Sequence, residues 1–134
     1  MTSNLILKYA DSLIQMEKEA VENVKNAENV SQEKRKERED ANSRLTRIKE
    51  TMDENYREFW NMAWTIIKML FKRPGNPAEI ERALMPINGY KDALKSVPAA
   101  EKDCETAQKN YQASKLELSK AVKLQKMLKE IQNL

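Results

Sequence analysis

Glycine and proline are confined to one window of this 134-residue chain. The two glycines are Gly75 and Gly89, and all four prolines lie between Pro74 and Pro98, whereas residues 3–72 contain neither. A β-sheet protein of this size needs turn signals about every 8–12 residues. The sequence therefore predicts an all-α fold, and its length corresponds to a single domain.

The first predicted helix covers about residues 3–72. Its apolar residues recur at alternating spacings of three and four, the pattern of a helix seam that packs on another helix. The spacing from Ile48 through Met52 to Tyr56 is four and four, which predicts a stutter in the seam. The predicted seam is Leu13, Ala20, Val24, Ala27, Ala41, Leu45, Ile48, Met52, Tyr56, Phe59, Ala63, Ile66 and Leu70.

The weakest part of this helix is predicted between residues 23 and 38. Three asparagines lower the helix propensity there, and the seam positions are occupied by the polar residues Ser31, Lys34 and Arg38. A break near residues 30–31 is therefore the alternative to one continuous helix.

The second half of the chain is predicted to contain two helices. Pro77 suits the first position of a short helix over about 77–85, and Pro86 and Gly89 predict a break at 86–90. A final helix is expected over about 97–132. Its predicted seam is Ala100, Cys104, Ala107, Tyr111, Ser114, Leu118, Ala121, Gln125, Leu128 and Gln132.

Together these elements predict an elongated, coiled-coil-like antiparallel helical hairpin. The short helix is expected to cover the wide apolar surface near the end of the first helix and to complete a three-helix head. The residues predicted as the core of this head, or as a partner hot spot, are Phe59, Trp60, Trp64 and Phe71.

The final predicted helix is much shorter than the first predicted helix. A final helix of about 36 residues rises about 54 Å, so it would cover the first helix back only to about residue 35. The first 30 residues would then need another chain, or the helix would have to bend back near Ser31 into a compact bundle. The predicted partner interface is Ile6, Tyr9, Leu13, Met16, Ala20 and Val24.

Residues that commonly carry catalysis are missing from the sequence. There is no histidine, which removes the usual general base and the commonest zinc ligand. The single cysteine, Cys104, is predicted to be a small buried seam residue. No glycine-rich phosphate-binding loop is present. The chain is therefore predicted to be non-enzymatic, with no catalytic residue, no metal site and no cofactor.

The sequence also predicts a cytoplasmic protein. A lone cysteine gives no indication of an oxidising compartment. The N-terminal segment contains only three consecutive apolar residues, at 5–7, whereas a signal peptide needs about 7–15.

The charges are nearly balanced, with 24 basic and 21 acidic residues. This balance is typical of a solvated surface and counts against a nucleic-acid partner. A lysine-rich face near the C-terminus can nevertheless meet an anionic partner such as a membrane surface. The residues of this face are Lys115, Lys120, Lys123, Lys126 and Lys129.

The predicted function is a helical protein–protein interaction module that forms a homodimer or docks on another helical protein, acting as a scaffold or adaptor. The first alternative is a membrane-surface or curvature-associated scaffold that uses the basic C-terminal helix. In outline the predicted hairpin also resembles small secretion-type chaperones and small phage or viral accessory binding proteins, which implies a second alternative. No motif assigns the chain to a family.

Overall fold

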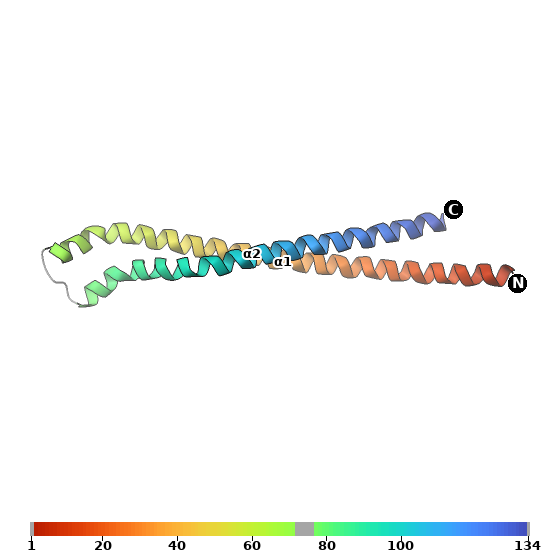
Figure 1. Ribbon diagram of the computed structural model, residues 1–134, viewed down its shortest axis with the longest axis horizontal. Coiled ribbons are helices and arrows are strands. Elements are labelled where there is room, and N and C mark those ends of the chain that lie inside the picture. Colours follow the sequence, from red (N-terminus) through yellow and green to blue (C-terminus); the bar gives the residue numbers. More distant parts are fainter. Residues whose placement is uncertain (1, 72–76, 134) are drawn as a thin grey trace. The chain divides into compact units, whose positions relative to one another are not determined.

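The computed structural model describes residues 2–71 and 77–133, with the side chains of 7–68 and 77–133, and consists of two helices (Figure 1). Helix α1 is Thr2–Phe71 and helix α2 is Pro77–Gln132. The helices run antiparallel and pack against each other. The prediction of an all-α helical hairpin is confirmed, and the described residues contain no strand.

The packed helix pair divides into two units. Unit 1 combines Met1–Arg38 with Thr106–Leu134, and unit 2 is Glu39–Glu105. In unit 1 the Gln132 amide donates a hydrogen bond of 2.6 Å from Nε2 to Oε2 of Glu17. In unit 2 the rings of Tyr56 and Tyr90 lie 6.5 Å apart. Each unit is therefore a pair of antiparallel segments, one from each helix.

Helix α1 is a single helix of 70 residues. The structure places no break near residues 30–31, the alternative that the polar seam residues had suggested. The segment lacks proline and glycine, so no residue in it removes a backbone hydrogen bond or adds backbone freedom.

The seam of α1 keeps one heptad register. Between Leu13 and Ile66 the buried and half-buried residues follow alternating spacings of four and three. Ala63 is the one half-buried residue of this stretch that lies outside the series. The predicted stutter is therefore wrong: half-buried Asn55 occupies the seam, and Tyr56 beside it is 55% exposed. The physical reason lies on α2, where Gly89 leaves room for the Asn55 side chain.

The space at Gly89 is narrow. A β-carbon at this position would lie 2.5 Å from Oδ1 and 2.8 Å from Cγ of Asn55. The amide nitrogen of Asn55 donates a hydrogen bond of 2.8 Å to the Thr51 carbonyl, which satisfies its polar side chain inside the helix. An asparagine can therefore fill a seam position that an apolar residue would ordinarily occupy.

The second half of the chain differs from the prediction. Helix α2 is one helix of 56 residues in place of the short helix, the break at 86–90 and the separate final helix. A third short helix is accordingly not present in the described chain, and the head at this end has two helices, not three.

The prolines do not end α2 because its seam continues through them. Buried or half-buried residues recur at Ala83, Pro86, Tyr90, Ala93 and Val97 in the same register as the seam that follows. A proline in a helix interior costs about 3 kcal/mol. Packing of a continuous seam on α1 offsets this cost, so the tertiary contact overrides the local preference. The predicted seam from Ala100 to Leu128 is buried or half-buried at every position.

The core between the helices is built from small side chains. Its buried apolar residues are Ala20, Ala41, Ala83, Pro86, Ala100, Ala107 and Leu128, and the serines Ser31 and Ser114 are buried with them. Among the described residues no large side chain is fully buried. Small residues allow two helices to approach closely, but they remove little apolar surface from water.

Candidate functional site

The predicted partner interface near the N-terminus is only partly exposed. Because α2 has 56 residues and not about 36, it reaches back to Glu17. Ala20 is 2% exposed, and Leu13 and Val24 are half-buried, all within unit 1. The inference that nothing in the chain covers the first 30 residues is therefore wrong.

Two members of that interface do face solvent. Tyr9 is 66% exposed and Met16 is 54% exposed. Both residues lie outside the seam, each one residue before a position of the seam register. The side chain of Ile6 lies outside the described residues. Figure 1 also shows α1 extending past the C-terminal end of α2, so the first turns of α1 lie beyond the end of the helix pair.

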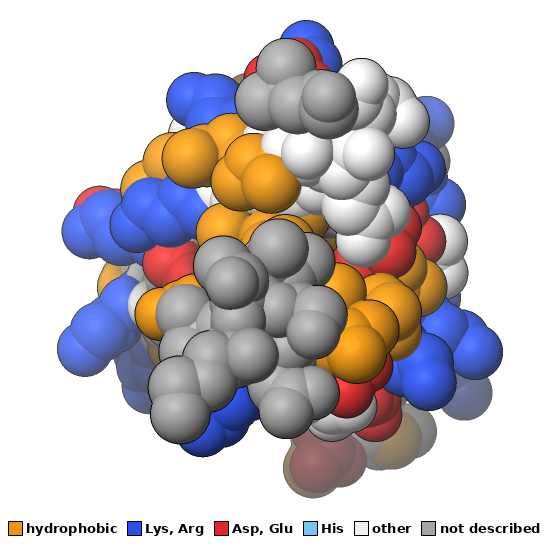
Figure 2. Space-filling view, turned by 90° about the vertical axis from the view of Figure 1, so that its right-hand side faces the viewer, with side chains coloured by type: hydrophobic (Ala, Val, Ile, Leu, Met, Phe, Trp, Pro, Cys, Tyr) orange, Lys and Arg blue, Asp and Glu red, His pale blue; other side chains and the backbone are white. Residues whose placement is uncertain are grey.

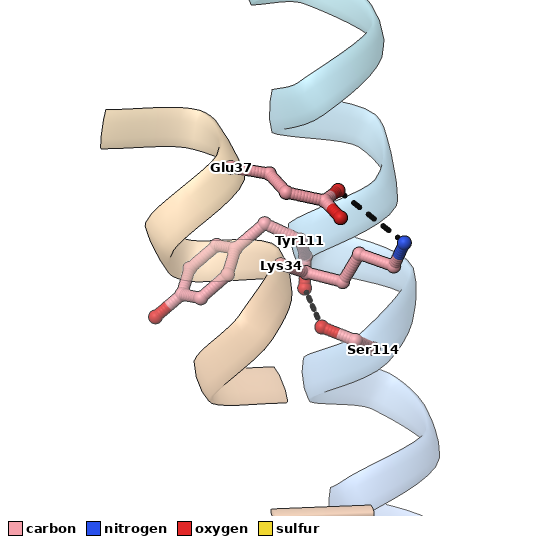
Figure 3. Close-up of polar contacts among 4 residues, drawn as sticks. All are labelled: Lys34, Glu37, Tyr111 and Ser114. Carbon is pink, nitrogen blue, oxygen red and sulfur yellow. Dashed lines mark hydrogen bonds and ion pairs between the residues drawn. The ribbon is translucent and has the colours of Figure 1, made fainter. Parts of the chain in front are cut away.

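A polar layer lies in the seam of unit 1, where the sequence had lost its apolar pattern. The Arg38 guanidinium lies 4.5 Å from the centre of the Tyr111 ring, and its Nη1 donates a hydrogen bond of 3.3 Å to Oε1 of Gln108. On the other helix, Ser114 Oγ donates a bond of 2.6 Å to the Tyr111 carbonyl (Figure 3).

Lys34 completes this layer from α1. Its ammonium pairs with Glu37 at 3.3 Å, one turn further along the same helix (Figure 3). Within the described chain no buried side-chain nitrogen or oxygen lacks a hydrogen-bond partner. The polar residues of the seam are therefore accommodated by local partners, without a break in either helix.

An aromatic cluster lies in unit 2. The ring of Trp60 lies 6.1 Å from Tyr56 and 5.4 Å from Phe59, in both cases edge to face. Tyr90 of α2 joins through Tyr56. Such edge-to-face pairs stabilise aromatic clusters beyond the area they bury. The cluster holds four of the eight aromatic residues of the chain.

The two tryptophans are exposed. Trp60 is 58% and Trp64 is 66% exposed, and Lys68 lies over the Trp64 ring at 5.8 Å. Their assignment to a core within this chain is therefore wrong, whereas the alternative, a partner hot spot, stays a prediction. Phe59 is half-buried, and the side chain of Phe71 lies outside the described residues.

A groove opens on one flank of unit 2. It has a volume of about 330 Å³ and is lined by Asn55, Tyr56 and Phe59 of α1 and by Pro86, Ile87 and Tyr90 of α2. Tyr56 and Ile87 each follow a seam residue by one position. The groove therefore places Tyr56 of α1 and Ile87 of α2, each one residue outside the seam, on the same flank of unit 2.

This flank carries a second apolar pattern, here called the second stripe. On α1 it runs through Tyr56, Trp60, Ala63 and Ile67, and on α2 through Ile80, Leu84, Ile87, Lys91 and Leu94. The spacings are again three and four, which is the spacing of the seam itself. The seven large apolar members are between 40% and 58% exposed.

Sequence reasoning missed the second stripe as a separate surface. The apolar width of residues 56–71 was visible, but it was assigned to contacts with a third helix. The matching pattern on α2 was not found because the predicted break at 86–90 divided it. A search for a second three-and-four repeat, displaced from the seam by one residue, would have found both halves.

The predicted anionic-partner face in unit 1 is exposed at all five lysines. Lys120 pairs with Glu117 at 3.5 Å, and Lys115 lies 5.3 Å from the Tyr111 ring. The apolar residues Leu116 and Met127 are 58% and 59% exposed on the same stretch of α2. Viewed toward the chain ends, apolar side chains reach the surface between Lys and Arg side chains (Figure 2).

Cys104 lies at the predicted seam position, in unit 2, but it is half-buried and not buried. Across residues 2–71 and 77–133, no cluster of three or more Cys, Asp or Glu side chains has an arrangement that could hold a metal ion. In the same part of the chain, neither helix contains a stretch apolar and long enough to cross a membrane.

Comparison with protein-family models, with curated proteins and with solved structures finds no match to this chain.

Proposed function

We propose that the chain is a non-enzymatic helical protein–protein interaction module that self-associates as a homodimer and acts as a scaffold or adaptor. Closed two-fold dimers are the commonest assemblies of identical chains. The alternative within this class is docking on a different helical protein.

One observation supports this proposal above the others. Twenty of the described large apolar side chains are between 40% and 66% exposed, whereas the described buried apolar residues are five alanines, Pro86 and Leu128. Contiguous exposed apolar surface is typical of interaction sites. Two helices whose buried apolar residues are mostly alanine bury little apolar area, and a second copy would bury the large side chains that the hairpin leaves in water.

The test is the mass of the full chain in solution. Light scattering during size-exclusion chromatography, at several loading concentrations, should give twice the chain mass of 15.6 kDa at the higher concentrations. A mass of 15.6 kDa at every concentration would refute self-association. A mixed complex with a different helical protein, formed by a chain that is otherwise monomeric, would support the docking alternative.

The C-terminal lysines support a second candidate, binding to a membrane surface. Between residues 115 and 134 five lysines stand against two glutamates, an excess of three that equals the formal net charge of the whole chain, +3. Exposed Leu116 and Met127 lie among these lysines, which is the combination that interfacial helices use on anionic lipid.

Vesicles separate this candidate from self-association. Vesicles containing about 30–40% phosphatidylserine should retain the chain at low salt and release it at high salt, because the attraction is electrostatic. Vesicles of neutral phosphatidylcholine are the control. Equal retention on both, or no retention at low salt, would refute the membrane candidate.

A further inference from the structure

We infer that the second stripe of unit 2 is the dimer interface, and that it pairs with the same stripe of a second copy to form a four-helix bundle. This inference rests on the proposed self-association and adds the surface, the symmetry and the register. The two-fold axis runs parallel to the helices, so that α1 of one copy lies beside α2 of the other.

The spacing of the stripe identifies a helix as its partner. Tyr56, Trp60, Ala63 and Ile67 repeat the alternation of three and four by which α1 already packs on α2. A helix with two such seams on adjoining faces packs against two neighbours. Helix α2 has the same pattern. The stripes of α1 and α2 therefore both lack a packed helix on this flank.

A second copy meets this need directly. The groove residues Tyr56 and Ile87 place the stripes of α1 and α2 on one flank. A two-fold rotation about an axis beside that flank sets α1 against α2 of the second copy and α2 against its α1. Neighbouring helices are then antiparallel throughout, as in many four-helix bundles.

Charge selects the register. The second stripe contains one charged residue, Lys91 on α2, and its register on α1 continues one step before Tyr56 to Asp53; both residues are exposed. Asp53 precedes Tyr56 by three residues, a rise of about 4.5 Å, and Lys91 follows Ile87 by four, about 6 Å. Because the helices are antiparallel, both steps lead in the same direction from the groove. Asp53 of each copy therefore meets Lys91 of the other at the same level.

The available area agrees with a stable dimer. The exposed parts of the seven large apolar side chains amount to on the order of 600 Å² per copy, with roughly 150–250 Å² for each whole aromatic side chain and the lower end of that range for each aliphatic one. Two copies would bury about 1,200 Å², the lower limit of specific, stable interfaces. Rim contacts, including the Asp53–Lys91 pairs, add to this area.

Charge reversal tests the interface without removing any apolar contact. The dissociation constant of the full chain is measured by sedimentation equilibrium for Asp53→Lys, for Lys91→Asp and for an equimolar mixture of the two. Each variant alone places like charges together twice per dimer, and we expect its dissociation constant to rise by about tenfold or more. In the mixture, each chain meets the opposite charge twice, so a heterodimer should form with nearly wild-type affinity.

The matched controls are Glu54→Lys and Lys95→Asp, which make the same charge changes on exposed positions outside the stripe. Circular dichroism verifies that all variants stay helical. Dissociation constants for the stripe variants that equal those of the controls, or a mixture no tighter than its components, would refute this interface while leaving self-association intact. A wild-type chain that is monomeric at every concentration would instead refute the proposed function itself.

Discussion

The guanidinium of Arg38 lies 4.5 Å from the centre of the Tyr111 ring, across the two helices of unit 1. A cation over an aromatic face contributes about 0.5–1 kcal/mol at exposed sites and more when it is desolvated. Arg38 also donates a hydrogen bond to Gln108. This pair joins α1 and α2 in the part of the seam that lacks apolar residues.

Arg38→Ala should lower the free energy of unfolding by about 1 kcal/mol, because it removes the contact with the ring and a charge-assisted hydrogen bond. Tyr111→Phe should change it little, since the ring remains. Urea unfolding at one fixed protein concentration measures both. Arg47→Ala, an exposed arginine of the same helix, is the control. An equal loss for Arg38→Ala and Arg47→Ala would contradict a specific role for the pair.

Gly89 and Asn55 should be coupled. In a helix interior, Gly→Ala ordinarily stabilises by about 1 kcal/mol. At Gly89 the new β-carbon would displace the Asn55 amide from its bond to Thr51, so the net change for Gly89→Ala alone should be near zero. In an Asn55→Ala background the full gain of about 1 kcal/mol should appear.

A double-mutant cycle of thermal or urea unfolding gives this coupling energy. Additive effects of the two substitutions would mean that the side chain of Asn55 does not lie against Gly89. Such additivity would also contradict the observed seam position of Asn55.

Leu128 should be the most sensitive leucine of unit 1. It is 7% exposed in a part of the seam whose other buried residues are alanines and serines, and Leu→Ala at buried sites costs about 2–5 kcal/mol. We expect Leu128→Ala to fall at the lower end, about 2 kcal/mol, because a helix pair can relax around the cavity. Leu116→Ala, at 58% exposure, should change the free energy of unfolding by less than about 0.5 kcal/mol. Similar losses for the two variants would contradict the observed seam.

Pro98→Ala tests whether α2 is one helix. Pro98 is exposed in the helix interior, and its nitrogen cannot donate the bond that an α-helix would make to the Leu94 carbonyl. Alanine restores this bond, so the free energy of unfolding should rise by about 2 kcal/mol. Pro77→Ala is the control, since proline at the first helical position is already well tolerated. If α2 were broken at this point, Pro98→Ala would give no gain.

The heptad pattern predicted the fold class and most of the seam, and the reason is physical. A helix that packs along its whole length must place the same face on its neighbour every three or four residues, as α2 does from Ala100 to Leu128. The polar layer at Lys34 and Arg38 left α1 unbroken because its side chains find partners on α2 or within their own helix.

The prolines of α2 and Asn55 of α1 were not predictable in the same way. Local rules treat Pro86 and Gly89 as a helix break, and only the seam contact with α1 outweighs that preference. Asn55 fits the seam because Gly89 faces it, a match between residues 34 positions apart that no local pattern contains. The second stripe was missed for the same reason, since half of it lies across the predicted break.

We propose that a second chain covers the apolar surface that one hairpin leaves in water. The two tryptophans of the chain, Trp60 and Trp64, lie on or beside the second stripe, so their emission reports on that surface. Fluorescence is recorded while the full chain is diluted through its dissociation. We predict a shift of the emission to longer wavelength whose midpoint coincides with the change in mass. Emission that already corresponds to water-exposed tryptophan in the associated chain, and does not change on dilution, would contradict the claim.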